Sequence, residues 1–209
     1  MSWFAEQSVV LQAFLAGLFT WTCTIIGSGI VFFFKNVNRK LLDTMQGFAA
    51  GVMIAASFWS LLAPSISYAE PIYGSWSWVP AAVGFLLGGY FLRFIDAIIP
   101  HLHLGHDIAK AEGGSKEERK KLSKTALLFL AITIHNIPEG LAVGVTFGAL
   151  ANNFSQAAYV GALGLALGIG LQNIPEGSAL SIPIRTDGKT RQQAFFWGAM
   201  SAIVEPIAA

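Results

Sequence analysis

The sequence predicts an all-α protein, a polytopic bundle of transmembrane helices, and three observations favour this class. Hydrophobic residues make up 54% of the 209-residue chain, and only 12% of its residues are charged. That charged fraction is about half of the roughly 25% that is usual in soluble proteins. Mean hydropathy is +0.58. The apolar residues also gather into long runs, comparable to the ~20 residues that a helix needs to cross a bilayer.

Six apolar segments are predicted to be membrane-spanning helices of a single transmembrane domain, at about residues 9–34, 41–62, 79–100, 125–150, 157–184 and 194–209. The first is too long for the apolar region of a signal peptide and has no basic stretch before it, so we expect a retained helix. The second is rich in small residues, which let a neighbouring helix approach closely, and we expect it to end at Pro64. The aromatic residues that follow suit a membrane–water interface.

The later segments carry polar features at their ends. Arg93 and Asp96 are three residues apart in the third segment, so they share a helix face and are expected to form an ion pair. A strongly polar loop, 101–124, follows. The last run of 16 residues is shorter than a bilayer crossing. We therefore expect the native gene to continue past Ala209.

The basic residues predict an orientation. Of the 13 Lys and Arg residues, three follow the first segment, six follow the third and three follow the fifth. Arg93 lies inside a segment, and the N-terminus and the other loops hold none. Lys and Arg concentrate in cytoplasmic loops, so the N-terminus is predicted to lie outside and loop 101–124 in the cytoplasm. We expect an integral, multi-pass protein of the plasma or inner membrane.

One six-residue phrase occurs twice in the chain. Residues 135–140 are HNIPEG and residues 172–177 are QNIPEG. Each copy lies inside an apolar segment, where a carboxylate is costly and by default marks a functional site. Residues four apart share a helix face, which pairs His135 with Glu139 and Gln172 with Glu176.

The prolines of the two phrases lack an N–H and clash with the carbonyl four residues back. Each helix is therefore predicted to kink and to free one carbonyl where the polar side chains cluster. At ~1.5 Å per residue, His135 lies about 15 Å into its segment and Gln172 about 22 Å into the next. Both are in the middle region of the bilayer. Consecutive spans run in opposite directions, so the copies are related by inverted topology, a common plan in transporters.

Together the phrases supply an imidazole, two carboxylates and the carboxamides of Asn136 and Asn173. This set suits a borderline divalent metal such as zinc, iron, manganese or cobalt. Two facing carboxylates repel each other unless a cation lies between them or one of them takes a proton. The alternative is that both glutamates are protonated and only hydrogen-bond another helix, which leaves the duplication unexplained.

The paired HNIPEG and QNIPEG phrases resemble the ZIP family of divalent-metal transporters, and in particular its GufA-like subgroup. The resemblance covers essentially the whole chain and includes Glu205 in the sixth segment. It implies a ZIP-like bundle with six spans present of an expected eight, so two further spans would follow Ala209. It also implies transport toward the cytoplasm, by sliding or rocking of a bundle that contains the fourth and fifth spans. Zinc is the expected substrate, with iron, manganese, cobalt or cadmium as alternatives.

The resemblance further implies a binuclear metal site, formed by His135, Asn136, Glu139, Gln172, Asn173, Glu176 and Glu205. The main transport position would take its ligands from His135, Glu139, Gln172 and Glu176. A second position would use Asn136, Asn173 and Glu205 and share both phrase glutamates. Many relatives carry Asp in place of Asn173, so the neutral side chain here should weaken or broaden metal binding.

Other residues are weaker candidates. Met53 and Ser60 match positions that face the pathway in the family, although such residues usually serve packing. The family often carries histidines in the third loop. His101, His103 and His106 are therefore candidates for metal contacts on the cytoplasmic side. Asp43 would attract an exiting cation, but an acid near a helix start is also favoured by the helix dipole.

Several function classes are disfavoured. We expect no enzyme, because an intramembrane metalloprotease needs H-E-x-x-H and Asn136 follows His135 here. A channel with an acidic constriction remains the main alternative to a carrier. Cys23 is the only cysteine, which excludes an internal disulfide. The scattered basic residues do not indicate nucleic-acid binding. The expected partners are the lipid bilayer, divalent metal as substrate rather than cofactor, and a second copy in a homodimer.

Overall fold

The structure, a computed structural model, describes residues 2–34, 39–102, 108–116, 122–152 and 154–209. Over these ranges the chain is almost entirely helical, and the β-type pairing found there is an isolated antiparallel bridge between His101 and Glu112. Five described helical stretches are long and apolar enough to cross a membrane: Val9–Phe32, Asp43–Trp76, Trp78–Ile98, Lys124–Ala149 and Gln156–Thr186. The prediction of an all-α transmembrane bundle is therefore confirmed.

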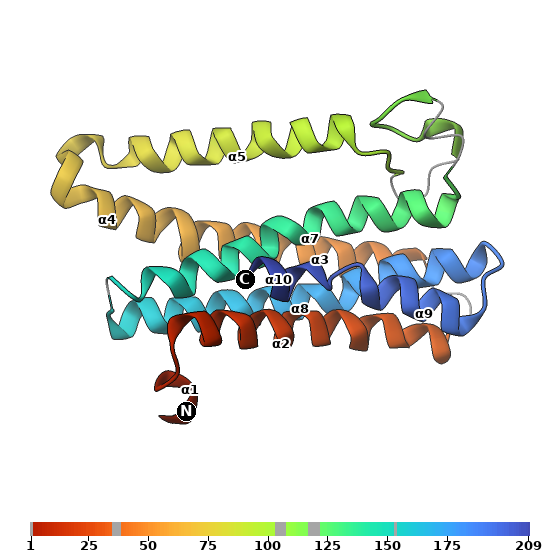
Figure 1. Ribbon diagram of the computed structural model, residues 1–209, viewed down its shortest axis with the longest axis horizontal. Coiled ribbons are helices and arrows are strands. Elements are labelled where there is room, and N and C mark those ends of the chain that lie inside the picture. Colours follow the sequence, from red (N-terminus) through yellow and green to blue (C-terminus); the bar gives the residue numbers. More distant parts are fainter. Residues whose placement is uncertain (1, 35–38, 103–107, 117–121, 153) are drawn as a thin grey trace.

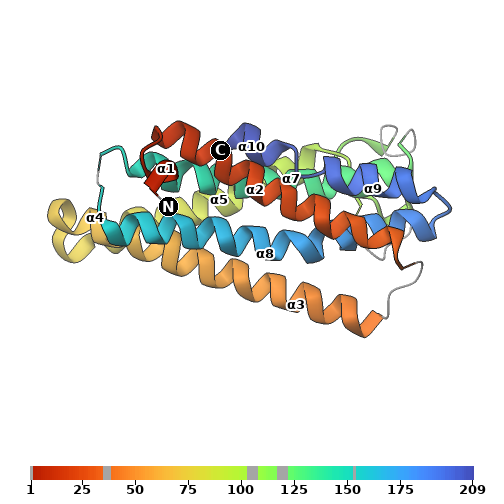
Figure 2. The ribbon, with the colours of Figure 1, turned by 90° about the horizontal axis from the view of Figure 1, so that it is seen from below.

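The helices follow one another in this order: α1 (Ser2–Ala5), α2 (Val9–Gly29) with a 3₁₀ turn η1 (Ile30–Phe32), α3 (Arg39–Ala56), a π-helical turn η2 (Ser57–Leu62), α4 (Ala63–Tyr73), η3 (Gly74–Trp76), α5 (Trp78–Ile98), η4 (Ile108–Lys110), α7 (Lys124–Ala149), α8 (Gln156–Thr186), α9 (Arg191–Met200) and α10 (Val204–Ala208). Figure 1 shows α2, α7 and α8 side by side with α9 and α10 against them, whereas α5 lies apart at the edge. Figure 2 shows α3 along the flank of α8.

The second apolar segment does not end at Pro64, as the sequence had suggested. The helix continues through it: α3 passes into η2 and then into α4, in which Pro64 lies in the first turn. The wide π turn explains this, because the Ala63 N–H bonds to the carbonyl of Phe58, five residues back. A wider turn relieves the clash that a proline makes with the carbonyl four residues before it.

The sixth apolar segment is also different from the prediction. It forms two helices, α9 and α10, separated by a turn at 201–203. Pro206 explains the turn, because it cannot donate to the Ala202 carbonyl; the Glu205 N–H takes that carbonyl instead, at 3.0 Å. The break puts Glu205 in the first turn of α10.

The prolines of the repeated phrases do not break their helices. α7 remains helical through Pro138, and α8 through Pro175 and Pro183. Neither phrase proline donates a backbone hydrogen bond, so the carbonyls of Ile134 and Leu171 lack their usual donor. The close packing of α2, α3 and α7 around α8 supports its helical path past the missing bonds.

The tightest packing in the bundle joins α2 to α8, and it depends on two glycines. A Cβ atom at Gly27 would lie 1.9 Å from the carbonyl oxygen of Ile174, and one at Gly177 would lie 2.3 Å from that of Thr24. No side chain fits at such distances. Gly177 is the last residue of the second phrase, so the phrase that carries the polar side chains also brings α8 against α2.

Polar contacts gather at the end of the bundle that holds the basic loops. The ends of α2, α5 and α8 lie there with the starts of α7 and α9 (Figure 1). Lys124 pairs with Asp187 at 3.0 Å, which ties α7 to the end of α8. The Arg185 guanidinium donates to the carbonyls of Val31 and Phe34. The predicted Arg93–Asp96 ion pair is present at 3.4 Å.

Candidate metal site

Three helices bring the phrase residues and Glu205 together. α7 carries His135, Asn136 and Glu139; α8 carries Gln172, Asn173 and Glu176; and α10 carries Glu205. The glycine of the first phrase allows α10 to approach, because a Cβ atom at Gly140 would lie 2.5 Å from the Glu205 carbonyl oxygen. Both glycines of the repeated phrase therefore serve close backbone contact, a role that the sequence analysis did not assign to them.

A continuous chain of hydrogen bonds links these helices. Gln172 Nε2 donates to Glu139 Oε2 and to Asn173 Oδ1, at 2.7 Å in each case. Asn173 Nδ2 in turn donates to both carboxylate oxygens of Glu205 at 2.9 Å. It also donates to the Thr20 carbonyl on α2 at 3.1 Å. The two amides of α8 thus connect a carboxylate on α7 with one on α10.

These groups are withdrawn from solvent. Asn136, Asn173 and Glu205 are 0% exposed, and Gln172 is 1% exposed. A buried carboxylate is costly unless hydrogen bonds or an opposite charge compensate it. Glu139 and Glu205 have amide donors, so the compensation is already partly built into the protein.

His135 is held in a defined tautomer. Its Nδ1 lies 2.7 Å from the Ala131 carbonyl oxygen. A carbonyl can only accept, so Nδ1 carries the proton and the neutral ring keeps a lone pair on Nε2. Metal-binding histidines are oriented in the same way, by a hydrogen bond from the nitrogen that does not bind the metal. His135 is solvent-accessible in this structure, unlike its neighbour Asn136.

Some buried polar atoms at the site have no hydrogen-bond partner in the part of the chain that the structure describes. They are Glu176 Oε1 and both side-chain heteroatoms of Asn136. Buried polar atoms without a partner cost free energy and are uncommon in folded proteins. Their presence beside His135 and Glu139 indicates a place that is prepared for a ligand.

A cavity of about 470 Å³, hereafter the site cavity, adjoins the phrases. Its lining includes His135, Glu139, Gln172 and Glu176 together with Gln46, Met53 and Ser57 of the α3–η2 segment and Leu92 of α5. Met53, a candidate from the sequence, therefore faces the phrase residues. Gln46 and Ser57 were not singled out from the sequence, because no motif marks them.

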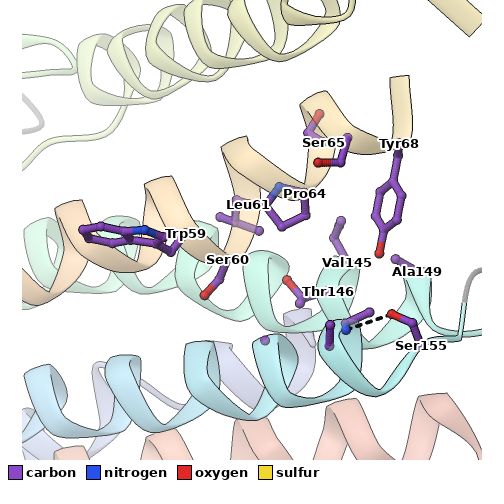
Figure 3. Close-up of a pocket in the computed structure, with 14 residues that line it drawn as sticks. Trp59, Ser60, Leu61, Pro64, Ser65, Tyr68, Val145, Thr146, Ala149 and Ser155 are labelled. Atoms are coloured by element: carbon purple, nitrogen blue, oxygen red, sulfur yellow. Dashed lines mark hydrogen bonds between the residues drawn. The ribbon is translucent and has the colours of Figure 1, made fainter. Parts of the chain in front are cut away.

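A second cavity, of about 570 Å³, lies near the end of α7 and the start of α8. Six hydroxyl-bearing residues line it: Ser60, Ser65, Ser67, Tyr68, Thr146 and Ser155. We call it the hydroxyl cavity. In Figure 3 the side chains of Ser60 and Tyr68 point from the η2–α4 segment toward α7. Ser60 thus lies in the hydroxyl cavity rather than beside the phrases, and Asp43 is exposed on α3 and lines neither cavity.

A separate group of ligand-type residues lies near the end of α5. Asp96, His101 and Glu112 each offer one ligand atom, and these atoms lie within 4.8 Å of one another. His101 is fully buried, with Nε2 3.0 Å from Asp96 Oδ1 and Nδ1 2.9 Å from the Ile99 carbonyl oxygen. Its backbone pairs with that of Glu112. His103 and His106 lie outside the described residues.

The imidazole and carboxylates of the phrases are more widely spaced than this group. Among the described residues they do not meet the same 4.8 Å spacing. A cation bound between α7 and α8 would therefore draw His135, Glu139 and Glu176 inward.

Comparison with known proteins identifies the family. Residues 9–209 match the family described as ZIP Zinc transporter. The chain is similar to "Zinc transporter ZIP11" of Xenopus tropicalis, at 41% identity over 96% of this chain and 79% of that protein. Human "Zinc transporter ZIP11" is 37% identical over 97% of this chain and 80% of its own length. "Zinc transporter GufA" of Myxococcus xanthus is 36% identical, with 93% and 72% covered. The chain therefore belongs to the ZIP family of zinc transporters.

Proposed function

We propose that this ZIP-family membrane transporter carries Zn²⁺ toward the cytoplasm and holds it, in transit, between the two phrases of α7 and α8. One observation carries the proposal. Glu139 and Glu176, two carboxylates from different helices, line one cavity with the oriented imidazole of His135. Relatives over most of the chain are named zinc transporters.

The transport position takes its ligands from both helices. His135 offers Nε2, Glu176 offers Oε1, and Glu139 keeps an oxygen that does not accept from Gln172. The side-chain oxygen of Gln172 is a fourth ligand, because the side-chain nitrogen already donates to Glu139 and Asn173. Zinc accepts such mixed nitrogen and oxygen sets with four ligands. A dication also cancels the charges of the two glutamates, which would otherwise repel each other.

The two cavities define a route along α7 and α8. The hydroxyl cavity is lined by α7 between 145 and 149 and by α8 between 157 and 161. The site cavity is lined by α7 between 132 and 139 and by α8 between 172 and 179. We place the hydroxyl cavity on the outer side, and a sliding of α7 and α8 past α3 transfers the ion between them. The contact between α3 and α8 at Gly168 leaves room for this movement. Even an added Cβ atom there would meet Val52 of α3 only at an ordinary 3.4 Å.

The group near the end of α5 fits an exit contact. Leu92, one turn before Asp96, lines the site cavity, so an ion leaving that cavity passes close to Asp96, His101 and Glu112. A nitrogen and two carboxylate oxygens suit zinc. We assign to His101, among the loop histidines, the role of receiving the ion.

Direction is tested in bacterial cells that express single-cysteine variants, since the native Cys23 is buried. Ser75→Cys and Asn152→Cys are expected to react with an impermeant maleimide, whereas Ser115→Cys and Lys189→Cys should react only after lysis. All four positions are exposed. The same cells should accumulate ⁶⁵Zn faster than cells with an empty vector. Labelling of Ser115→Cys in intact cells would contradict the predicted orientation. Uptake equal to the vector control would contradict the transport proposal.

A further inference from the structure

The resemblance to the ZIP family implied two adjacent metal positions, the second of them built on Asn173 and Glu205. We propose that in this chain Asn173 takes the place of the second ion: it holds Glu205 by hydrogen bonds, and the intramembrane site takes one divalent cation. This inference rests on the proposed function, because it specifies how many ions the transport site holds.

The orientation of the Asn173 amide is fixed from both sides. Its Nδ2 faces the Thr20 carbonyl at 3.1 Å and both oxygens of Glu205 at 2.9 Å. These acceptors require a donor, and the two amide hydrogens are fully used by them. Its Oδ1 accepts from Gln172 Nε2 at 2.7 Å.

A metal ligand at this position would have to present oxygen instead. Turning the amide over would set Asn173 Oδ1 against the Thr20 carbonyl and the Glu205 carboxylate, which are all acceptors. It would also take from Gln172 Nε2 one of its two acceptors, Asn173 Oδ1, and leave it Glu139. With the residue 0% exposed, no water takes over these bonds without rearrangement. Asn173 is therefore a donor that positions Glu205, and not a ligand.

The balance of charge at the site also favours a single divalent cation. The three helices contribute three carboxylates here, Glu139, Glu176 and Glu205. One dication leaves a single negative charge, which the N–H groups of Asn173 stabilise at Glu205. Two dications would leave a net positive charge in a buried place with no counter-ion, which is costly. An aspartate at 173 would supply the fourth carboxylate that two dications need.

The single position offers ligand atoms that are not engaged by hydrogen bonds. Glu176 Oε1 lacks a partner among the described residues, and His135 keeps a lone pair on Nε2. Glu205, by contrast, has both of its carboxylate oxygens engaged by Asn173. An arriving ion is thus bound where donors are unsatisfied, while α10 stays fastened to α8.

The test is metal counting on the purified full-length protein after loading with zinc and removal of unbound metal. We expect Asn173→Asp to hold one more zinc per chain than the unmodified protein. X-ray absorption should show zinc–zinc scattering at ~3.5–4 Å, the usual spacing of two-metal sites, in Asn173→Asp and not in the unmodified protein. Asn173→Ala adds no carboxylate and is the control, which should show no such scattering.

Asn173→Ala separates a positioning residue from a ligand. We expect it to keep the zinc count of the unmodified protein while it melts at lower temperature, because Glu205 loses its donors. Zinc–zinc scattering in the unmodified protein would overturn the inference, and so would a loss of one zinc in Asn173→Ala. If Glu176→Gln bound as much zinc as the unmodified protein, the proposed transport position itself would be wrong. These results distinguish the two proposals even where Asn173→Asp fails to fold.

Discussion

Glu139→Gln and Glu176→Gln each abolish zinc uptake, with an expected loss of about 100-fold or more. The reason is electrostatic. Each carboxylate offsets a full charge in a poorly solvated place, and glutamine keeps the shape and the hydrogen bonds but supplies only a dipole. A loss of about 3 kcal/mol in binding corresponds to roughly 100-fold. The initial rate of ⁶⁵Zn uptake by cells, normalised to protein in the membrane, measures the effect.

Glu70→Gln is the matched control for this result. Glu70 lies on α4, also within an apolar helix, but it is exposed and lines neither cavity. We expect its uptake to stay within about twofold of the unmodified protein, in line with the small effects of surface substitutions. Wild-type uptake by both site variants would mean that the two PEG phrases serve only the fold.

Gly177→Ala should destabilise the protein severely. A Cβ atom there would lie 2.3 Å from the Thr24 carbonyl oxygen and 2.9 Å from the Ser28 nitrogen. Both are backbone atoms of α2, so they cannot move aside by a side-chain rotation. Overpacking typically costs 1–3 kcal/mol, and more where backbone must move. At roughly 2–4 °C per kcal/mol, we expect the melting temperature in detergent to fall by about 10 °C.

Gly164→Ala on the same helix has open space around its new methyl group and should melt within about 2 °C of the unmodified protein, as surface changes usually do. Equal melting temperatures for the two variants would show that α2 and α8 do not approach as closely as described. Zinc uptake should fall in Gly177→Ala only in proportion to the folded protein that remains.

The sequence alone predicted the class of fold and the proximity of the residues in the two phrases. Long apolar segments predict the helices directly, and residues four apart predict that His135 and Glu139 lie together. The repeated phrase marked the contact between α7 and α8. These signals are local, so they survive whatever the neighbouring helices do.

What the sequence left open depends on tertiary contacts. Pro64 was expected to end a helix and does not, because η2 widens the turn before it, whereas Pro206 does break one. Proline chemistry is the same in both places, and only the surrounding geometry differs. One acceptor of the Asn173 amide is the Thr20 carbonyl, a backbone group that no sequence pattern marks. Glu112 reaches His101 through a backbone bridge in a polar loop, which no spacing rule predicts.

The most direct test of a carrier that binds zinc between α7 and α8 is zinc flux into liposomes that contain the purified protein. We predict nucleotide-independent influx that saturates as external zinc rises, that exceeds the influx into protein-free liposomes, and that disappears in Glu139→Gln. Saturation is expected because each transport cycle waits for the site to be filled and emptied. Influx that rises in proportion to zinc without saturating would contradict the carrier account and favour the channel alternative. Influx equal to that of protein-free liposomes would contradict transport altogether.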